Sequence, residues 1–102
     1  LYANFFQKRF KESTYNNFVD RYLDYKIEYL TATKDYIRLE KINKFVLNRY
    51  KKHEGEESKK YAIACSDYAD ALNFNGDIKG HIKWTEKSIS IKENLRRLKL
   101  RK

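Results

Sequence analysis

The side chains that could do covalent or metal chemistry are few in this chain and lie far apart along it. There is one cysteine, Cys65, and there are two histidines, His53 and His81. A lone thiol cannot form an internal disulfide or a cysteine-rich zinc site, and two distant histidines lack the spacing of metal ligands. No carboxylate pair, glycine-rich phosphate loop or Ser-His-Asp order stands out either. We therefore expect no catalytic residue, no metal ion and no cofactor, and we predict that the chain is not an enzyme.

Positive charge is the next feature that could support a function, and most of it lies at one end. The formal net charge is +9, and residues 87–102 carry seven Lys or Arg residues against one acid, which leaves +3 for residues 1–86. Such a tail could bind nucleic-acid phosphates or another anionic surface. Its basic residues also lie around the outer side of a helix whose apolar side is Ile91, Leu95 and Leu98, as in any solvated amphipathic helix. Binding through this tail is therefore the alternative function rather than the first.

Aromatic side chains offer a second possible surface for nucleic acid. Four of them fall on one helical stripe, namely Phe18, Tyr22, Tyr25 and Tyr29. Bases can stack on such a platform, but an unbroken aromatic stripe at helical spacing is first of all a packing face. We expect the stripe to pack on a preceding helix that presents Phe5, Phe6 and Phe10.

The composition predicts that helices carry all of these side chains. Aromatic residues make up 16% of the 102 residues, so a core can form, whereas there is no proline and there are only three glycines. An all-β domain needs many more turn residues, so we predict an all-α fold. No apolar run reaches membrane-spanning length, and no signal peptide is visible. The lone cysteine indicates a reducing compartment, so we expect the protein in the cytoplasm.

Short polar segments predict where the helices begin and end. The breaks fall at residues 11–17, 31–35, 53–58 and 73–77. In the first of them Ser13 or Thr14 is a candidate N-cap. Gly55 in the third and Gly76 in the fourth can take the conformation that ends a helix.

The second pair of predicted helices repeats the first at an offset of 42 residues. Asp35 opens one helix and Asp77 opens another, and Leu30 coincides with Leu72. Further coincident pairs are Leu23 with Cys65, Ile42 with Trp84 and Leu47 with Ile89. A fixed period across helical hairpins indicates a stacked array of repeats.

Residues 76–91 read G-D-I-K-G-H-I-K-W-T-E-K-S-I-S-I and resemble the second half of a tetratricopeptide repeat (TPR). The period of 42, in place of about 34 residues, is similar to the kinesin-light-chain-like class of that family. The matching family positions are Ala69, Leu72, Gly76, Ile82, Trp84 and Ser88. The resemblance covers roughly residues 15–98 and implies an α-solenoid of antiparallel hairpins with about two and a half repeats.

Three residues depart from the family pattern. His81 and Leu39 stand where the family prefers alanine, and Lys34 replaces the glycine of the first turn. We expect His81 either to turn sideways to a polar partner or to splay the second hairpin. Cys65 falls on a narrow face of small residues, where a thiol behaves as a small hydrophobe.

The resemblance implies one helical-repeat domain over residues 1–102. Its parts would be the end of a preceding helix (1–12), a first hairpin (14–52), a second hairpin (58–98) and a basic tail (99–102). Repeats of this kind bury their faces against neighbours, and about three or more are normally needed for stability. We therefore expect this chain to be a fragment flanked by further repeats, or its exposed ends to self-associate.

In this family the first helix of each hairpin lines a concave groove. Carried over to this chain, the groove positions are Arg21, Asp24, Glu28, Thr31, Ile63, Ser66, Asp70 and Asn73. Acids at such positions would repel a peptide carboxylate and favour a basic ligand. The resemblance thus implies a non-catalytic protein–protein interaction scaffold with a protein or peptide partner, preferably a basic one. A regulatory repeat region of a larger enzyme or transcription regulator is a further alternative.

Overall fold

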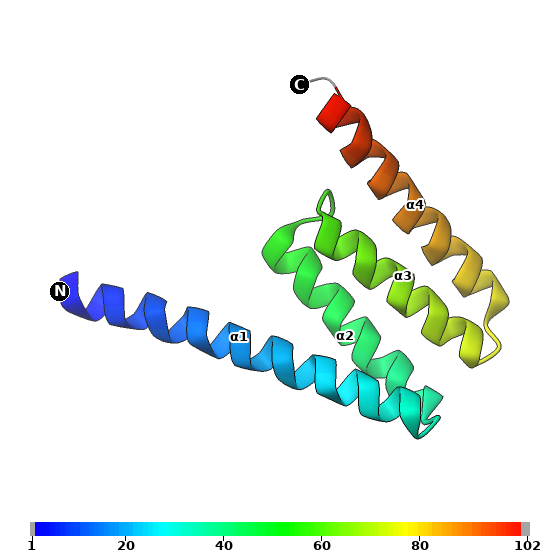
Figure 1. The fold of residues 1–102 in the computed structure, drawn as a ribbon, viewed down its shortest axis with the longest axis horizontal. Coiled ribbons are helices and arrows are strands. Elements are labelled where there is room, and N and C mark those ends of the chain that lie inside the picture. The colour runs from blue at the N-terminus through cyan, green and yellow to red at the C-terminus, as the bar shows by residue number, and fades with distance from the viewer. Residues whose placement is uncertain (1, 101–102) are drawn as a thin grey trace.

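The computed structural model describes the backbone of residues 2–100 and the side chains of residues 16–100. Within these residues the chain forms the helices α1 (Tyr2–Ala32), α2 (Tyr36–Glu54), α3 (Lys59–Phe74) and α4 (Ile78–Leu100), and no strand. Successive helices run in opposite directions, and α1 and α3 lie on either side of α2 (Figure 1). The predicted all-α fold is confirmed over this part of the chain.

Three of the four predicted breaks are confirmed, and their caps explain why the helices stop there. Asp35 accepts a hydrogen bond from the Arg38 N–H at the start of α2, and Ser58 accepts one from the Tyr61 N–H at the start of α3. Gly55 ends α2 with φ of 87° and ψ of 165°, a positive-φ conformation that glycine adopts at little cost.

The remaining prediction, a break at residues 11–17 with a separate helix over residues 1–12, is wrong. Helix α1 is continuous over 31 residues. Ser13 and Thr14 are good N-caps, but the segment has no glycine or proline to end a preceding helix, and their cost inside a helix is below about 1 kcal/mol each. The helix therefore runs through, and its first half extends beyond the other helices (Figure 1). The side chains of Phe5, Phe6 and Phe10 lie outside the described residues.

Helix α3 is the centre of the core, because it packs against both α2 and α4. Its predicted narrow face is buried: Ala62, Cys65 and Ala69 are all 0% exposed. Such small side chains allow close approach, and the Ser88 hydroxyl of α4 donates a 2.7 Å hydrogen bond to the Ala62 carbonyl. Ala62 and Cys65 belong to the main cluster, whose other buried members are Leu47, Tyr61, Ala64, Tyr68, Leu72 and Ile91.

His81 turns to a polar partner, which is the first of the two expected arrangements. Its Nδ1 lies 2.9 Å from the carbonyl oxygen of Ala69 on α3. Because a carbonyl oxygen only accepts, Nδ1 must carry the proton in this contact. The histidine therefore ties α4 to α3 at a position where alanine would only fill space.

The turn between α1 and α2 repeats in the turn between α3 and α4. Each backbone hydrogen bond of the first turn has a counterpart 42 residues later. The Lys34 N–H donates to the Thr31 carbonyl and the Gly76 N–H to that of Asn73; the Asp35 N–H donates to Leu30 and the Asp77 N–H to Leu72. The period seen in the sequence is thus present in the backbone of the two turns.

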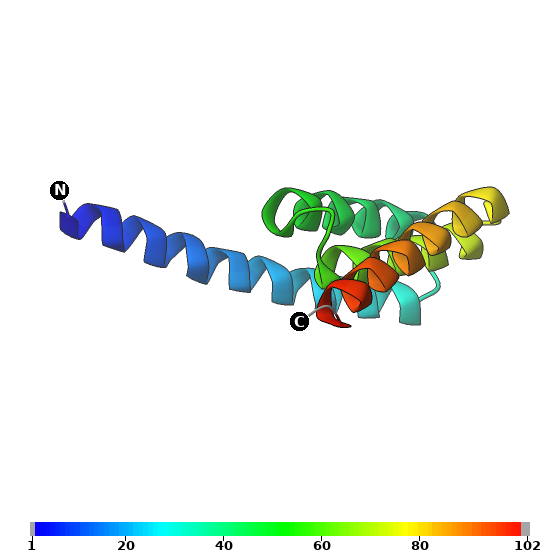
Figure 2. The same ribbon diagram turned by 90° about the horizontal axis from the view of Figure 1, so that it is seen from above.

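Within residues 2–100, close packing joins α1 to α2, α2 to α3 and α3 to α4, but not α1 to α3. Figure 2 shows α2 on one side of these two helices. Side chains of α2 are therefore accessible between α1 and α3, and this is where a hollow forms.

Candidate binding site

The hollow between α1 and α3 has a volume of about 310 Å³ and mixes apolar and acidic side chains. Helix α2 forms its floor. Its lining consists of Ile27 and Thr31 from α1, Leu39 and Asn43 from α2, and Asp67, Asp70, Ala71 and Phe74 from α3. We call this the acidic hollow.

The two carboxylates of the acidic hollow share one side of α3. Asp67 and Asp70 are three residues apart, a spacing that places side chains next to each other on a helix. Neither forms an ion pair with another described residue. The site therefore holds negative charge that this part of the protein does not neutralise.

The pKa of Asp67 records this environment. Desolvation raises it above the ordinary value of 3.8, and the charges of Asp70 and Asp24 raise it further, whereas Lys92 of α4 lowers it. Asp67 is exposed as a residue, yet its surroundings disfavour the charged form. Asp24 on α1 is close enough to act on it, so the acidic character extends across from α3 to α1. A cationic ligand would relieve this repulsion.

A polar side chain without a partner lies at the floor. Asn43 is only 4% exposed, and its amide makes no side-chain hydrogen bond within residues 16–100. Among these residues, every side-chain nitrogen or oxygen that is fully buried has a hydrogen-bond partner. The amide atoms of Asn43 have none, so they must belong to the small part of this residue that solvent can reach. Because Asn43 lines the hollow, that amide opens into it.

Apolar side chains complete the walls and hold them in place. Phe74 stacks on Tyr36 with 4.6 Å between ring centroids and 17° between ring planes. The Asn75 amide donates a 2.7 Å hydrogen bond to the Tyr36 carbonyl, which fixes the end of α3 on the start of α2. Phe74 is still half exposed, so an aromatic surface remains available to a ligand.

A separate contact sets the angle between α1 and α2. The Arg49 guanidinium donates to the Asp20 carboxylate at 3.2 Å and to the Asn16 side-chain oxygen at 3.1 Å. Arg49 also donates to the Asn16 carbonyl at 3.3 Å. Three hydrogen bonds from one planar group hold α2 firmly against α1.

The structure places the predicted groove residues on this face in part. Thr31 and Asp70 line the acidic hollow, and Asp24 acts on its charge. The remaining predicted positions do not line the hollow. Of these, Ser66 is half-buried, and the exposed ones are Arg21, Glu28, Ile63 and Asn73. The Thr31 hydroxyl donates to the Ile27 carbonyl of its own helix at 2.7 Å, so its donor is already used.

Two polar residues of the site were absent from the sequence prediction. Asp67 lies one helical turn before Asp70, and that spacing alone could have found it. Asn43 lies four residues after Leu39 and four before Leu47, both of which are buried. A polar residue inside this inward-facing stripe was the available signal.

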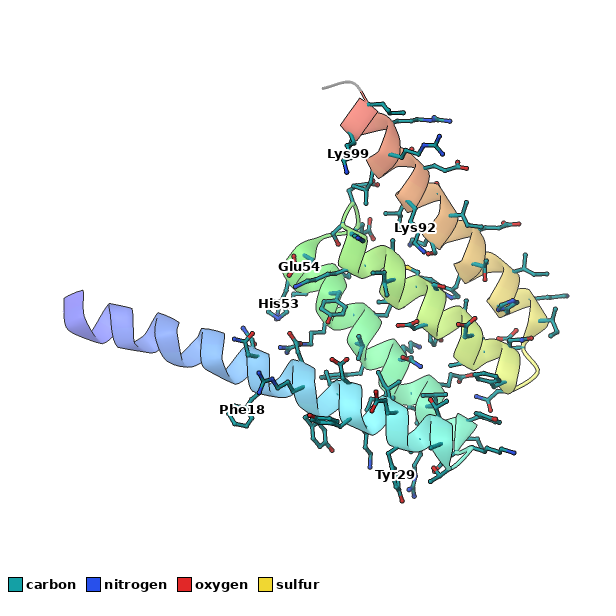
Figure 3. The ribbon with its side chains drawn as sticks, in the orientation of Figure 1. Phe18, Tyr29, His53, Glu54, Lys92 and Lys99 are labelled. Atoms are coloured by element: carbon teal, nitrogen blue, oxygen red, sulfur yellow. The ribbon has the colours of Figure 1, made fainter. Side chains whose placement is uncertain are left out.

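The other conspicuous residues divide between the core and the outer surfaces. The aromatic stripe of α1 is exposed, with 62–73% of each residue accessible at Phe18, Tyr22, Tyr25 and Tyr29. Within the described residues, no helix covers it as expected. Figure 3 shows Phe18 and Tyr29 projecting from the side of α1 away from α2. Trp84 instead packs edge-on against the Tyr68 ring, with 5.4 Å between centroids.

Cys65 is fully buried, and burial raises the pKa of its thiol. A thiol that stays protonated is a poor nucleophile and a poor metal ligand. Within the described residues, no three His, Cys, Asp or Glu side chains converge as a metal site would require. None of the helices in this part of the chain combines the length and apolarity needed to cross a bilayer.

Comparisons of the chain with protein-family models, with curated proteins and with solved structures give no match. The tetratricopeptide resemblance therefore stays a proposal.

Proposed function

We propose that this protein is a non-catalytic interaction module of tetratricopeptide-like hairpins, which binds a basic segment of a partner protein. The ligand would lie on the face where α1 and α3 flank α2. This face corresponds to the concave groove that the family resemblance implies.

The acidic hollow is the observation that supports this proposal. It combines two carboxylates that have no described cationic partner with apolar and aromatic walls. Apolar walls supply contact area, and a few convergent polar groups orient a ligand and give specificity. Since the groups at the rim are acidic in a chain of net charge +9, the face favours a cationic ligand that the rest of the surface would repel.

The test is a selection from a displayed random-peptide library against the whole chain, followed by binding measurements on the selected peptides. We expect enrichment of peptides rich in Lys and Arg. In ¹⁵N-resolved NMR titrations, their largest shifts should fall on α1 and α3, around Asp67 and Asp70. The matched control is the charge-reversed analogue of each selected peptide, which should bind more weakly at the same salt concentration.

Two outcomes would contradict the proposal. One is a library that yields no enrichment, or enrichment of acidic sequences. The other is binding of basic peptides with shifts confined to α4 or to the outer side of α1, away from the acidic hollow.

A further inference from the structure

We propose that the acidic hollow is a pocket for a single arginine side chain of the partner, with its guanidinium placed between the α3 carboxylates and the Asn43 amide. This inference rests on the proposed function, because it names the group that the binding face would take. It concerns one pocket, whereas the proposed function concerns the whole face.

Asn43 is the residue that marks the hollow as a binding site. An amide that is largely withdrawn from water and has no hydrogen-bond partner within the protein destabilises the folded state. Asn43 is 96% buried, since 4% is exposed, and its neighbours at the same spacing along α2 are leucines. Leucine would fill this position without that cost. A donor ligand that reaches the amide oxygen would supply the missing partner and account for an asparagine here.

The charge at the rim selects a cationic donor. Asp67 and Asp70 are adjacent on α3, and Asp24 adds negative charge from α1. The described positive charge that lowers the pKa of Asp67 is that of Lys92, which does not line the hollow. Lys92 belongs to α4 (Figure 3), whereas the hollow is lined by residues of α1, α2 and α3. The lining of the hollow, as formed by the described residues, thus contains two carboxylates and no lysine or arginine.

The shape and lining favour arginine over lysine. A guanidinium is planar and has five donors, so it can pair with carboxylates along one edge and donate to an amide oxygen along another. It also stacks on aromatic surfaces and is more weakly hydrated than an ammonium group. Phe74 offers such a surface, and the hollow of about 310 Å³ has room for the whole head group.

The experiment is an NMR titration of the ¹⁵N-labelled chain with N-acetyl-arginine amide in the millimolar range. The side-chain NH₂ resonances of Asn43 are a local probe at the floor. We expect them to shift, together with the backbone amides of Asp67, Asp70 and Phe74. The control is N-acetyl-citrulline amide, which has nearly the same shape without the charge and should bind at least about tenfold more weakly, since a charge-assisted hydrogen bond contributes more than a neutral one.

Variants then separate the pocket from the surrounding face. The double variant Asp67→Asn with Asp70→Asn should weaken N-acetyl-arginine amide about tenfold or more, whereas Glu86→Gln, on exposed α4, should leave it unchanged. Asn43→Leu should abolish the shifts at the hollow while the melting temperature stays equal or rises. If Asn43→Leu does not fold, the double variant still decides the matter.

The outcomes distinguish this inference from the proposed function. Equal binding of the arginine and citrulline probes, or no effect of the double variant, overturns the arginine pocket. Tighter binding of N-acetyl-lysine amide than of the arginine probe overturns the choice of arginine. If library-derived basic peptides still bind to α1 and α3 in these cases, the proposed function stands without the pocket. If they do not bind there, both fail.

Discussion

Lys34 and Gly76, 42 residues apart, both hold a backbone conformation with positive φ, 59° at Lys34 and 83° at Gly76. Each lies two residues after the last residue of a helix, α1 or α3. The backbone N–H of each donates to the carbonyl three residues earlier. Glycine adopts this conformation with little cost, whereas a residue with a Cβ is strained in it by about 1 kcal/mol or more. The turn hydrogen bonds and the caps that follow must therefore hold Lys34 in place.

The first prediction concerns this strained lysine. Replacing it, Lys34→Gly, should raise the free energy of unfolding by about 0.5–1 kcal/mol, because the relief of strain exceeds the added freedom of the unfolded chain. The matched control is Lys44→Gly, at an exposed position inside α2, which should lower it by a similar amount. Urea unfolding of the three proteins measures both differences. Destabilisation by Lys34→Gly would show that the turn is not left-handed at this residue.

The second prediction concerns the charge of Asp67. Its pKa is raised in the folded state, so the folded protein binds this proton more tightly than the unfolded chain does. The resulting contribution to stability is full below pH 3.8, the ordinary value, and is lost as the pH rises through the folded pKa. The charged form of Asp67 thus destabilises the folded protein, and Asp67→Asn should raise the melting temperature at pH 7. The gain should disappear at a pH below 3.8.

The control for that experiment is Glu86→Gln, which makes the same change in net charge at an exposed position of α4. It should alter the melting temperature less than Asp67→Asn does at pH 7. A fall in melting temperature for Asp67→Asn at pH 7 would mean that a cation already pairs with this carboxylate.

The third prediction concerns two buried core side chains that lose a proton at high pH, a thiol and a phenol. Burial raises the pKa of the Cys65 thiol, and it raises the pKa of Tyr61 to about 12. Because the neutral forms are favoured in the folded state, the stability they contribute is present below the unfolded values of 9.0 and 10.0 and is lost at higher pH. The free energy of unfolding should therefore fall as the pH rises from 8 to about 11. Tyr61→Phe should reduce this dependence.

The same environment protects the thiol. In the folded protein at pH 8, a thiol reagent such as dithionitrobenzoate should react with Cys65 far more slowly than in the unfolded protein. A rate equal to that of the unfolded chain would mean that α3 opens readily from the core.

The turns were the most predictable part of the fold, because their signals are local. Asp35, Ser58 and Gly55 act on backbone groups within one helical turn, so their residue types alone indicate the helix ends. The predicted break at residues 11–17 was wrong because only one of the two local signals is present there. Ser13 and Thr14 carry a starting signal, but nothing nearby carries a stopping one, and a continuous helix keeps every backbone hydrogen bond.

The acidic hollow was less predictable, because it depends on the angle between three helices. Asp70 and Thr31 follow from the family groove positions, but Asn43 belongs to the second helix of the hairpin, which that pattern does not place in the groove. It reaches the hollow only because α1 and α3 do not pack together over it. The separation of two helices is a tertiary property, and the 42-residue period carries no information about it.

The fourth prediction concerns the basic helix α4 and separates the proposed function from nucleic-acid binding. Lys87 lies 5.1 Å from the centre of the Trp84 ring and 5.6 Å from that of Tyr61, so it packs on the fold. Lys92 acts on the charge of Asp67. With Lys87 packed on the fold, we expect unrelated RNA or DNA to bind weakly or not at all at about 150 mM salt, and to show a steep loss of affinity with salt below that. Fluorescence anisotropy with a labelled oligonucleotide measures this. Tight binding at about 150 mM salt would favour the nucleic-acid alternative.

The fifth prediction concerns the exposed aromatic stripe of α1. At the 42-residue offset, Tyr22 and Tyr29 correspond to Ala64 and Ala71, and both alanines are buried in the second hairpin. The two tyrosines therefore occupy positions that a helix covers elsewhere in the same chain. They contribute nothing to the described core, so Tyr22→Ser with Tyr29→Ser should leave the melting temperature nearly unchanged.

The same variant should alter association. Exposed rings at a helix-packing position favour contact with another chain, as the expected self-association through repeat ends requires. Sedimentation velocity over a range of concentrations should show association of the unmodified chain that the double variant reduces. The control pair is Ile37→Ser with Phe45→Ser, which removes two exposed apolar side chains of α2 outside the stripe and should leave association unchanged. Equal association of all three proteins would remove the stripe as the contact surface. A large fall in melting temperature for the tyrosine variant would instead place these rings in the core of the folded chain.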